Sequence, residues 1–154
     1  MPTAKVSAGL LMYRRRPGGL EVLLVHPGGP FWKNKDAGAW TIPKGEPAAD
    51  EDLISAARRE FVEEIGVEPS GTFTPLAPIK QKGGKLVHAW AVEGDLDTKT
   101  IKSNTFTIEW PPKSGKQVEF PEVDRAEFFG LSDARMKVNV AQVALLDELE
   151  RMDP

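Results

Sequence analysis

The sequence contains no cysteine and only two histidines, His26 and His88. The absence of cysteine excludes disulfide bonds, thiolate-ligated zinc and thiol catalysis. Two histidines are too few for a zinc site built mainly from imidazoles, and each is interpreted as a structural residue. Any metal ion would therefore be held by oxygen atoms, which favours Mg²⁺ or Mn²⁺.

The sequence also lacks an excess of positive charge and a long apolar run. Its 20 basic and 23 acidic residues give a formal net charge of −3, which argues against a nucleic-acid polymer as partner. A local cation or a metal would still serve a small phosphorylated substrate. No apolar run approaches the roughly 20 residues that span a bilayer, and the apolar stretch at residues 9–13 is too short for a signal peptide. We therefore expect no membrane association and a cytoplasmic location.

The length of 154 residues and the hydrophobic content of 40% are typical of one globular domain, expected over residues 1–154. Strand patterns interleave with helical ones, which predicts a mixed α/β fold with helices on both faces of the sheet. The expected strands are residues 5–13, 20–26, 40–42, 72–81, 85–93, 105–110 and 125–129. The expected helices are residues 51–65, with start signals at Pro47 and Asp50 and a C-terminal cap at Gly66, and residues 132–151, capped by Ser132.

Three connecting segments are informative. Residues 14–16 are three arginines, which are interpreted as a solvated hairpin tip rather than as a phosphate site. Residues 113–118 are expected to be a polar loop. The loop at residues 27–39 is long enough to be functional. It carries Phe31 and Trp32 beside two lysines. These aromatic rings either cover an edge of the core or form a stacking platform for a nucleobase.

The expected helix at residues 51–65 carries Glu60, Glu63 and Glu64 at spacings i, i+3 and i+4, so the three carboxylates share one face. Arg59 offsets part of their mutual repulsion, because it lies four residues before Glu63. A divalent cation with oxygen ligands would relieve the rest. A glutamate-rich face is by itself usually solvated surface. Apolar side chains on a neighbouring arc would face the sheet, namely Ile54, Ala57, Phe61 and Ile65.

The segment at residues 45–67 resembles the Nudix box, G-x5-E-x7-R-E-U-x-E-E-x-G-U, in which U is a bulky apolar residue. A chance match to this pattern in a chain of this length has a probability on the order of 10⁻⁷. The matching residues are Gly45, Glu51, Arg59, Glu60, Phe61, Glu63, Glu64, Gly66 and Val67. More loosely, residues 7–9 and 39–45 look like diadenosine tetraphosphate hydrolases and MutT-type enzymes.

The resemblance implies an α/β/α sandwich with a mixed sheet between helices, and hydrolysis of a nucleoside diphosphate linked to a further group. It implies Glu60, Glu63 and Glu64 as metal ligands and as catalytic residues, with the carbonyl of Gly45 as a further ligand. Glu51 and Arg59 are then expected to orient these metal ligands. Because of this role, Arg59 is included among the expected catalytic residues.

Two residue types outside the box complete the expected site. Lys44 directly precedes the box and is either a substrate phosphate ligand or a surface lysine. The resemblance implies a catalytic base on a loop before the last strand. Glu122 is the best placed candidate and Glu119 the second, and a solvated loop glutamate is the alternative for either.

The predicted function is a Mg²⁺- or Mn²⁺-dependent hydrolase of nucleoside diphosphate derivatives, with dinucleoside polyphosphates as the favoured substrates. A MutT-type nucleoside triphosphate pyrophosphatase is the alternative. A third hypothesis is a non-catalytic nucleotide-sensing module, in which Phe31 and Trp32 serve binding. The expected partner is a small nucleotide, bound by a monomer or homodimer. Because a fold does not fix its substrate, the loops at residues 27–39 and 109–122 are expected to select it.

Overall fold

The computed structural model describes residues 5–154. Its strands are β1 (Val6–Arg16), β2 (Gly19–Pro27), β3 (Lys44–Gly45), β4 (Thr74–Pro75), β5 (Ile79–Lys80), β6 (Leu86–Glu93), β7 (Thr105–Glu109), β8 (Gln117–Pro121) and β9 (Val123–Gly130). Its α-helices are α1 (Leu53–Ile65), α2 (Leu131–Lys137) and α3 (Val143–Met152), and its 3₁₀ turns are η1 (Thr98–Thr100) and η2 (Val140–Gln142). No helix within the described residues is long and apolar enough to cross a bilayer.

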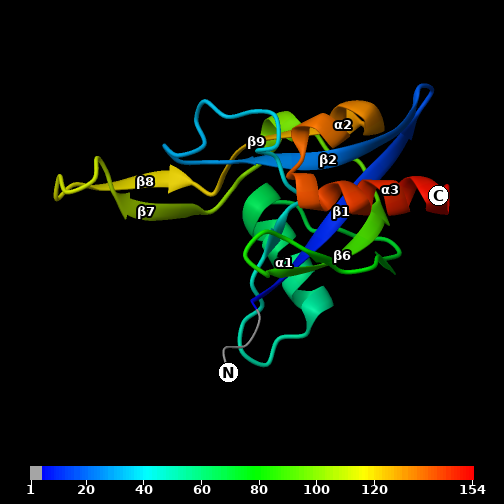
Figure 1. The fold of residues 1–154 in the computed structure, drawn as a ribbon, viewed down its shortest axis with the longest axis horizontal. Helices are drawn as coiled ribbons and strands as arrows, with labels where there is room; N and C mark the ends of the chain where they lie inside the picture. The colour runs from blue at the N-terminus through cyan, green and yellow to red at the C-terminus, as the bar shows by residue number, and fades with distance from the viewer. Residues whose placement is uncertain (1–4) are drawn as a thin grey trace.

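The main sheet is mixed, as predicted. Its strand order is β4-β6-β1-β2-β9, with β3 paired to β1 and β5 to β6. The pairing of β1 with β6 is parallel, and β2 is antiparallel to both β1 and β9. Helix α1 covers one face of this sheet, and α2 and α3 cover the other (Figure 1). The predicted arrangement of a mixed sheet between helices is therefore confirmed.

Each face of the sheet has its own core. Phe61 and Ile65 of α1 are fully buried against side chains of β1 and β2. Leu145 and Leu146 of α3 pack on the opposite face around Trp40, which is fully buried. Burial of one such side chain contributes about 1.5–3 kcal/mol. The two cores hold the sheet between its helices and fix the position of α1 over the end of β3.

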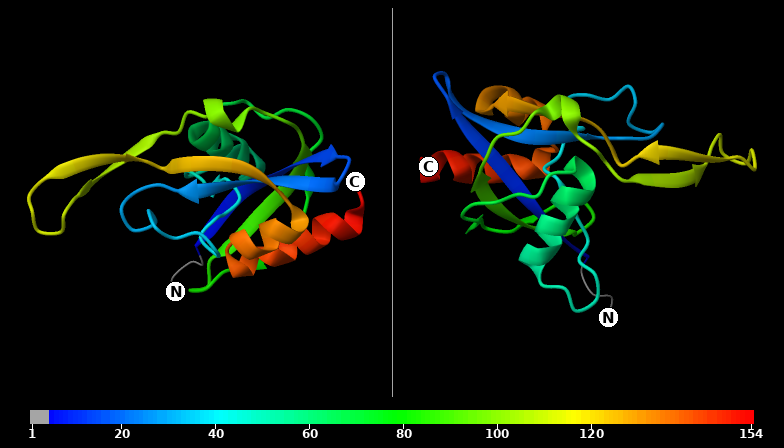
Figure 2. Two further views of the ribbon diagram at one scale, coloured as in Figure 1. Left: turned by 90° about the horizontal axis from the view of Figure 1, so that it is seen from above. Right: turned by 180° about the vertical axis from the view of Figure 1, so that it is seen from behind.

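Strands β7 and β8 form a separate two-stranded sheet. This hairpin projects from the body as an arm, and the loop after β2 lies beside it (Figure 2). The peptide bond between Trp110 and Pro111, at the end of β7, is cis. The arm includes the C-terminal part of the polar loop expected at residues 113–118, because β8 begins at Gln117.

Helix α1 begins two residues later than predicted. Its N-cap is Asp52, whose side chain accepts a hydrogen bond from the backbone N–H of Ser55 at 3.1 Å. Asp50 instead adopts a left-handed φ of 64°. Glu51 accepts the N–H of Ala48, which closes a turn before the helix. The predicted C-terminal cap is confirmed, because Gly66 ends α1 at a φ of 85°.

The three arginines were wrongly predicted to form a hairpin tip. Strand β1 continues through all of them, and Arg14 lies opposite Glu21 of β2. Arg14 also pairs with Asp95, at 2.8 Å, and its guanidinium lies 3.9 Å from the ring centroid of Phe128. These contacts stabilise the arginines within the strand, and the turn is formed by residues 17–18, between β1 and β2.

Other strand boundaries also differ from the prediction. Residues 40–42 make only isolated bridges, from Trp40 to Val138 and from Thr41 to Val25, and the ladder forms at Lys44 instead. The strand expected at residues 72–81 is two short strands, β4 and β5, which both pair with β6.

The closing helix is interrupted between α2 and α3. Val138 is extended (ψ 152°) because it bridges Trp40. Asn139 then caps η2 by accepting the N–H of Ala141. The residue before α2 is Gly130, which offers no side-chain cap, and Ser132 lies inside the helix. The prediction of a single helix capped by Ser132 was therefore wrong.

Candidate functional site

Two of the three box glutamates, Glu60 and Glu64, extend from α1 to β3. Glu64 is buried, and its Oε2 accepts the backbone N–H of Lys44 at 3.0 Å. The Glu60 carboxyl group lies directly against the α-carbon of Gly45, where any Cβ would overlap it. Only 14% of the Glu60 side chain is exposed, against 33% for Glu63. The helix and the short strand thus bring together residues that lie 15 or more positions apart.

Arg59 lies at the centre of this acidic group. Its Nε and Nη2 each donate to Glu51 at 2.9 Å. Its Nη1 donates to Glu60 at 2.9 Å and to both oxygens of Glu63 at 3.2 Å. The hydrogen bond from Arg59 lowers the pKa of Glu51 to about 2. Glu51 therefore anchors the guanidinium, while Nη1 reaches the candidate ligands.

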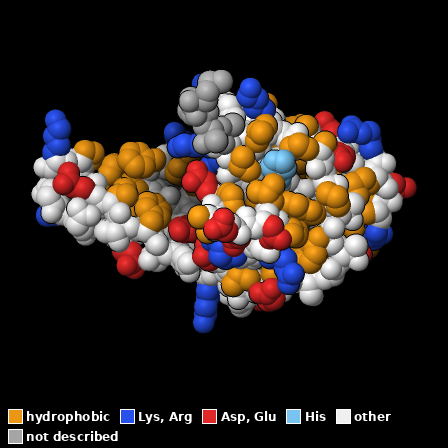
Figure 3. Space-filling model, turned by 90° about the horizontal axis from the view of Figure 1, so that it is seen from below, with side chains coloured by type: hydrophobic (Ala, Val, Ile, Leu, Met, Phe, Trp, Pro, Cys, Tyr) orange, Lys and Arg blue, Asp and Glu red, His pale blue; other side chains and the backbone are white. Residues whose placement is uncertain are grey.

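The carboxylates raise one another's pKa. Burial raises the pKa of Glu64 to about 8, and the charge of Glu60 adds to this effect. Burial also raises the pKa of Glu60, with a further contribution from Glu63. The pKa of Glu122 is raised by burial and then by Glu63. A cation placed among these groups would relieve the repulsion that these shifts report. Figure 3 shows acidic side chains gathered on this face, where the arm joins the body.

Glu122 is brought to the acidic group by the backbone between β8 and β9. Its N–H donates to the carbonyl of Asn104 at 2.8 Å, and the N–H of Asn104 donates to the carbonyl of Glu63 at 2.7 Å. The carbonyl of Glu122 accepts the N–H of Gly28 at 2.9 Å. Glu119, the second candidate base, is exposed in β8 opposite Thr107 on the arm.

Within residues 5–154, no three acidic or imidazole side chains are arranged closely enough to chelate a metal ion as they stand. Arg59 bonds to Glu60 and Glu63, and Glu64 is turned toward the Lys44 N–H. The donors nevertheless fit a hard cation, because they are carboxylates only and Gly45 leaves space for a carboxyl group beside its backbone. Glu51 can retain Arg59 when the other two carboxylates turn to an ion.

Lys44 and Trp32, two of the predicted substrate-binding residues, meet at one hollow of about 200 Å³. Trp40 and Gln142 also line it. Burial lowers the pKa of Lys44, and the nearby Lys85 lowers it further. Lys44 therefore lies at the boundary between this hollow and the acidic group, where a phosphate between the two would meet a cation.

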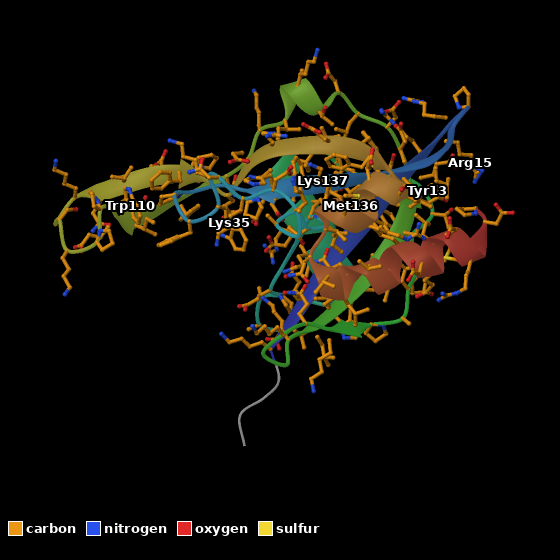
Figure 4. The ribbon with its side chains drawn as sticks, turned by 45° about the horizontal axis from the view of Figure 1, so that its top comes forward. Tyr13, Arg15, Lys35, Trp110, Met136 and Lys137 are labelled. Carbon is orange, nitrogen blue, oxygen red and sulfur yellow. The ribbon has the colours of Figure 1, made fainter. Side chains whose placement is uncertain are left out.

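Phe31 does not join Trp32. Its ring is 61% exposed and meets the ring of Trp110 edge-on, with centroids 5.4 Å apart. Trp32 is 39% exposed, and the ammonium of Lys35 lies 5.1 Å from its ring centroid. The loop thus places the two aromatic rings in different surroundings, one against the arm and one at the Lys44 hollow. Figure 4 labels Trp110 on the arm and Lys35 on the neighbouring loop.

The buried His26 fixes this loop to the sheet. Its Nδ1 lies 2.8 Å from Oδ1 of Asp124, and its Nε2 lies 2.7 Å from the carbonyl of Lys35. Both ring nitrogens are used within the protein, which agrees with a structural role. His88 lies half-buried within β6.

Replacement of Gly45 by alanine is expected to weaken Mn²⁺ binding about 10–100-fold with little loss of fold. The added Cβ would overlap the Glu60 carboxyl group and force it away from the Gly45 carbonyl. Calorimetric titration with Mn²⁺ measures this effect. Gly130→Ala is the matched control, because its Cβ enters open space at a φ of −59°. Equal Mn²⁺ affinity of the two variants would contradict the proposed ligand geometry.

Comparison with known proteins yields one family and several similar structures. The family described as NUDIX domain matches residues 3–149. No curated protein matches the chain.

Among solved structures, an Ap4A hydrolase of C. elegans in a binary complex is 22% identical, with a TM-score of 0.67. The alignment covers 95% of this chain and 96% of the other. The NUDIX domain of Shewanella oneidensis NrtR complexed with ADP ribose is 16% identical, with a TM-score of 0.70 and coverage of 100% and 91%. The E. coli ORF135 protein is 20% identical, with a TM-score of 0.58 and coverage of 99% and 96%. At these identities the structures establish the fold.

Proposed function

Because this chain belongs to the Nudix family and is a pyrophosphohydrolase of that family, we propose that it cleaves a diphosphate linkage in dinucleoside polyphosphates. The observation that carries the proposal is the complete box, folded so that Glu60 lies against Gly45 while Glu64 is held at Lys44. The similarity to the C. elegans Ap4A hydrolase over most of both chains supports the choice of substrate class.

We assign the residues as follows. Glu60, Glu63, Glu64 and the carbonyl of Gly45 would hold Mg²⁺ or Mn²⁺, and Arg59 with Glu51 would orient them. The bound ion supplies neutralisation of charge on the diphosphate oxygens. Lys44 binds a substrate phosphate, since its ammonium borders both the hollow and the acidic group.

A proton must leave the water that attacks phosphorus, and we assign Glu122 as the base that accepts it. The carboxyl group is half-buried and close enough to Glu63 for the two charges to interact. It comes from a different chain segment than the metal ligands, so it can serve as a base without giving up a ligand. Glu60 and Glu64 are the alternatives within the box.

A MutT-type nucleoside triphosphate pyrophosphatase is the second candidate function. The hollow at Lys44 and Trp32 borders the acidic group through Lys44, and the indole rings of Trp32 and Trp40 offer aromatic surface for one base. A triphosphate with a single base would use this hollow alone. The same residues would hold the metal ion and accept the proton, so the two candidates differ only in what lies beyond the phosphates.

The test is a hydrolysis screen with Mg²⁺ over nucleoside triphosphates, dinucleoside polyphosphates, nucleotide sugars and ADP-ribose. We expect metal-dependent phosphate or nucleotide release, with the highest kcat/KM for a dinucleoside polyphosphate. Hydrolysis of nucleotide sugars alone would contradict the substrate class. No release from any compound at high enzyme concentration would contradict the catalytic assignment and favour a sensing module.

A further inference from the structure

A hollow that borders the arm lies between β7–β8 and the loop after β2. Its volume is about 620 Å³, which is within the range of small-molecule sites. Trp110 and Phe120 line it from the arm, and Pro30 and Lys33 line it from the loop. We call this the arm hollow. Neither the box residues nor the Lys44 hollow includes any of these side chains.

Two glycines allow the close packing at the base of the arm hollow. A Cβ on Gly28 would overlap the carbonyl oxygen of Pro121, and a Cβ on Gly29 would come within 2.9 Å of the Phe106 ring. Gly29 also has a φ of 98°, which favours glycine. The two glycines therefore allow the loop to approach the arm closely. The rings of Phe31 and Trp110 also pack edge to face, which restricts the indole.

The two hollows approach the candidate centre along different segments of the chain. The Lys44 hollow ends at the residue before Gly45, and the arm hollow ends at Pro121, the residue before Glu122. Consecutive residues of the loop, Trp32 and Lys33, line different hollows. The loop thus lines both hollows, and each hollow includes the chain neighbour of a residue assigned to the centre.

The chemistry of the arm hollow suits a nucleoside. Trp110 and Phe120 supply aromatic surface for stacking a base. Lys33 supplies a cation for a phosphate. Asp124, whose Oδ1 pairs with His26, also lines this hollow, and 35% of its side chain is exposed. A carboxylate accepts hydrogen bonds and so favours a base with an exocyclic amino group.

We propose that the arm hollow binds the second nucleoside of a dinucleoside polyphosphate, while the Lys44 hollow binds the first. This inference rests on the proposed function, because it takes the phosphates to lie at the acidic group between the two hollows. It assigns Trp110 as a specificity-determining residue: a substrate with one base does not need it, and a substrate with two bases does.

The test compares binding of two probes to the full chain with Mg²⁺, using the methylene-bridged analogues of diadenosine tetraphosphate and of ATP. Trp110→Ala is expected to lower the affinity for the dinucleotide analogue by about 5–100-fold, which is the effect of losing one stacked base. Its affinity for the ATP analogue is expected to fall by less than about twofold. Trp110→Phe keeps an aromatic ring and should retain most of the affinity for both. Thr107→Ala, on the exposed side of β7, is the matched control and should change neither.

Three outcomes would overturn the inference. The first is an unchanged affinity of Trp110→Ala for the dinucleotide analogue. The second is an equal loss for both probes, which would assign Trp110 to the first nucleoside or to the shape of the arm. The third is a change in the oligomeric state of Trp110→Ala, measured by sedimentation, while its affinity for both analogues stays unchanged. That result would make the arm an interface between copies of the chain. Each leaves the hydrolysis screen intact, because that screen measures turnover and this test measures the ratio of two affinities.

Discussion

Replacement of Glu64 by glutamine is expected to stabilise the metal-free protein while abolishing its stabilisation by Mg²⁺. Burial and then the charge of Glu60 raise the pKa of Glu64 to about 8 from the ordinary value of 4.5. The folded chain therefore binds this proton more tightly than the unfolded chain. The resulting stability is fully present below about pH 4.5 and is lost as the pH rises toward 8.

Glutamine mimics the protonated carboxyl group and still accepts the Lys44 N–H. At pH 7.5 in EDTA we expect the free energy of unfolding of Glu64→Gln to exceed that of wild type by about 2–4 kcal/mol. This corresponds to a rise in Tm of about 5–15 °C for a chain of this size. The gain should shrink toward pH 5. With saturating Mg²⁺ the wild-type Tm should rise, and the variant's should not.

Differential scanning fluorimetry in EDTA and in Mg²⁺ measures both effects. Glu68→Gln is the control, because Glu68 is an exposed glutamate just beyond α1. A Glu64→Gln protein that is less stable than wild type in EDTA would contradict the electrostatic account. A normal response to Mg²⁺ would remove Glu64 from the ligand set.

Replacement of Glu63 by glutamine should lower kcat by about 10³-fold or more, because the variant loses one of the carboxylates assigned to the metal ion. Glutamine preserves the shape of the side chain and can still accept from Arg59. Affinity for the nucleotide in the absence of metal should stay largely intact, since this carboxylate repels rather than attracts phosphates.

Steady-state kinetics on the best substrate of the screen measure kcat, and calorimetry in EDTA measures affinity. This variant separates an enzyme from a sensing module that keeps the same fold. An activity of Glu63→Gln within tenfold of wild type would contradict the assignment, as long as Glu68→Gln behaves like wild type.

The local parts of the site were predictable from the sequence. The face shared by the box glutamates follows from helical periodicity alone, and Phe61 and Ile65 are buried on the neighbouring arc as expected. Gly66 ends the helix because its left-handed conformation favours glycine. These features depend on residues within about four positions of one another.

Features that depend on distant residues were not predictable. The contact of Gly45 with Glu60 requires β3 to pair with β1 beneath α1. The break between α2 and α3 arises because Val138 bridges Trp40. Trp110 was missed as a candidate site residue. Phe106, Ile108 and Trp110 alternate with polar residues, which indicates that they share one side of a strand. The sequence does not indicate which segment that side faces.

The most direct test of the central claim is a crystal structure of the full chain with Mn²⁺ and the methylene-bridged diadenosine tetraphosphate, phased to show the anomalous signal of manganese. The account predicts a manganese peak within bonding distance of carboxylate oxygens of Glu60 and Glu64 and of the carbonyl oxygen of Gly45, with Arg59 drawn toward Glu51. A manganese peak bound elsewhere, or an analogue whose phosphates lie away from these residues, would contradict it.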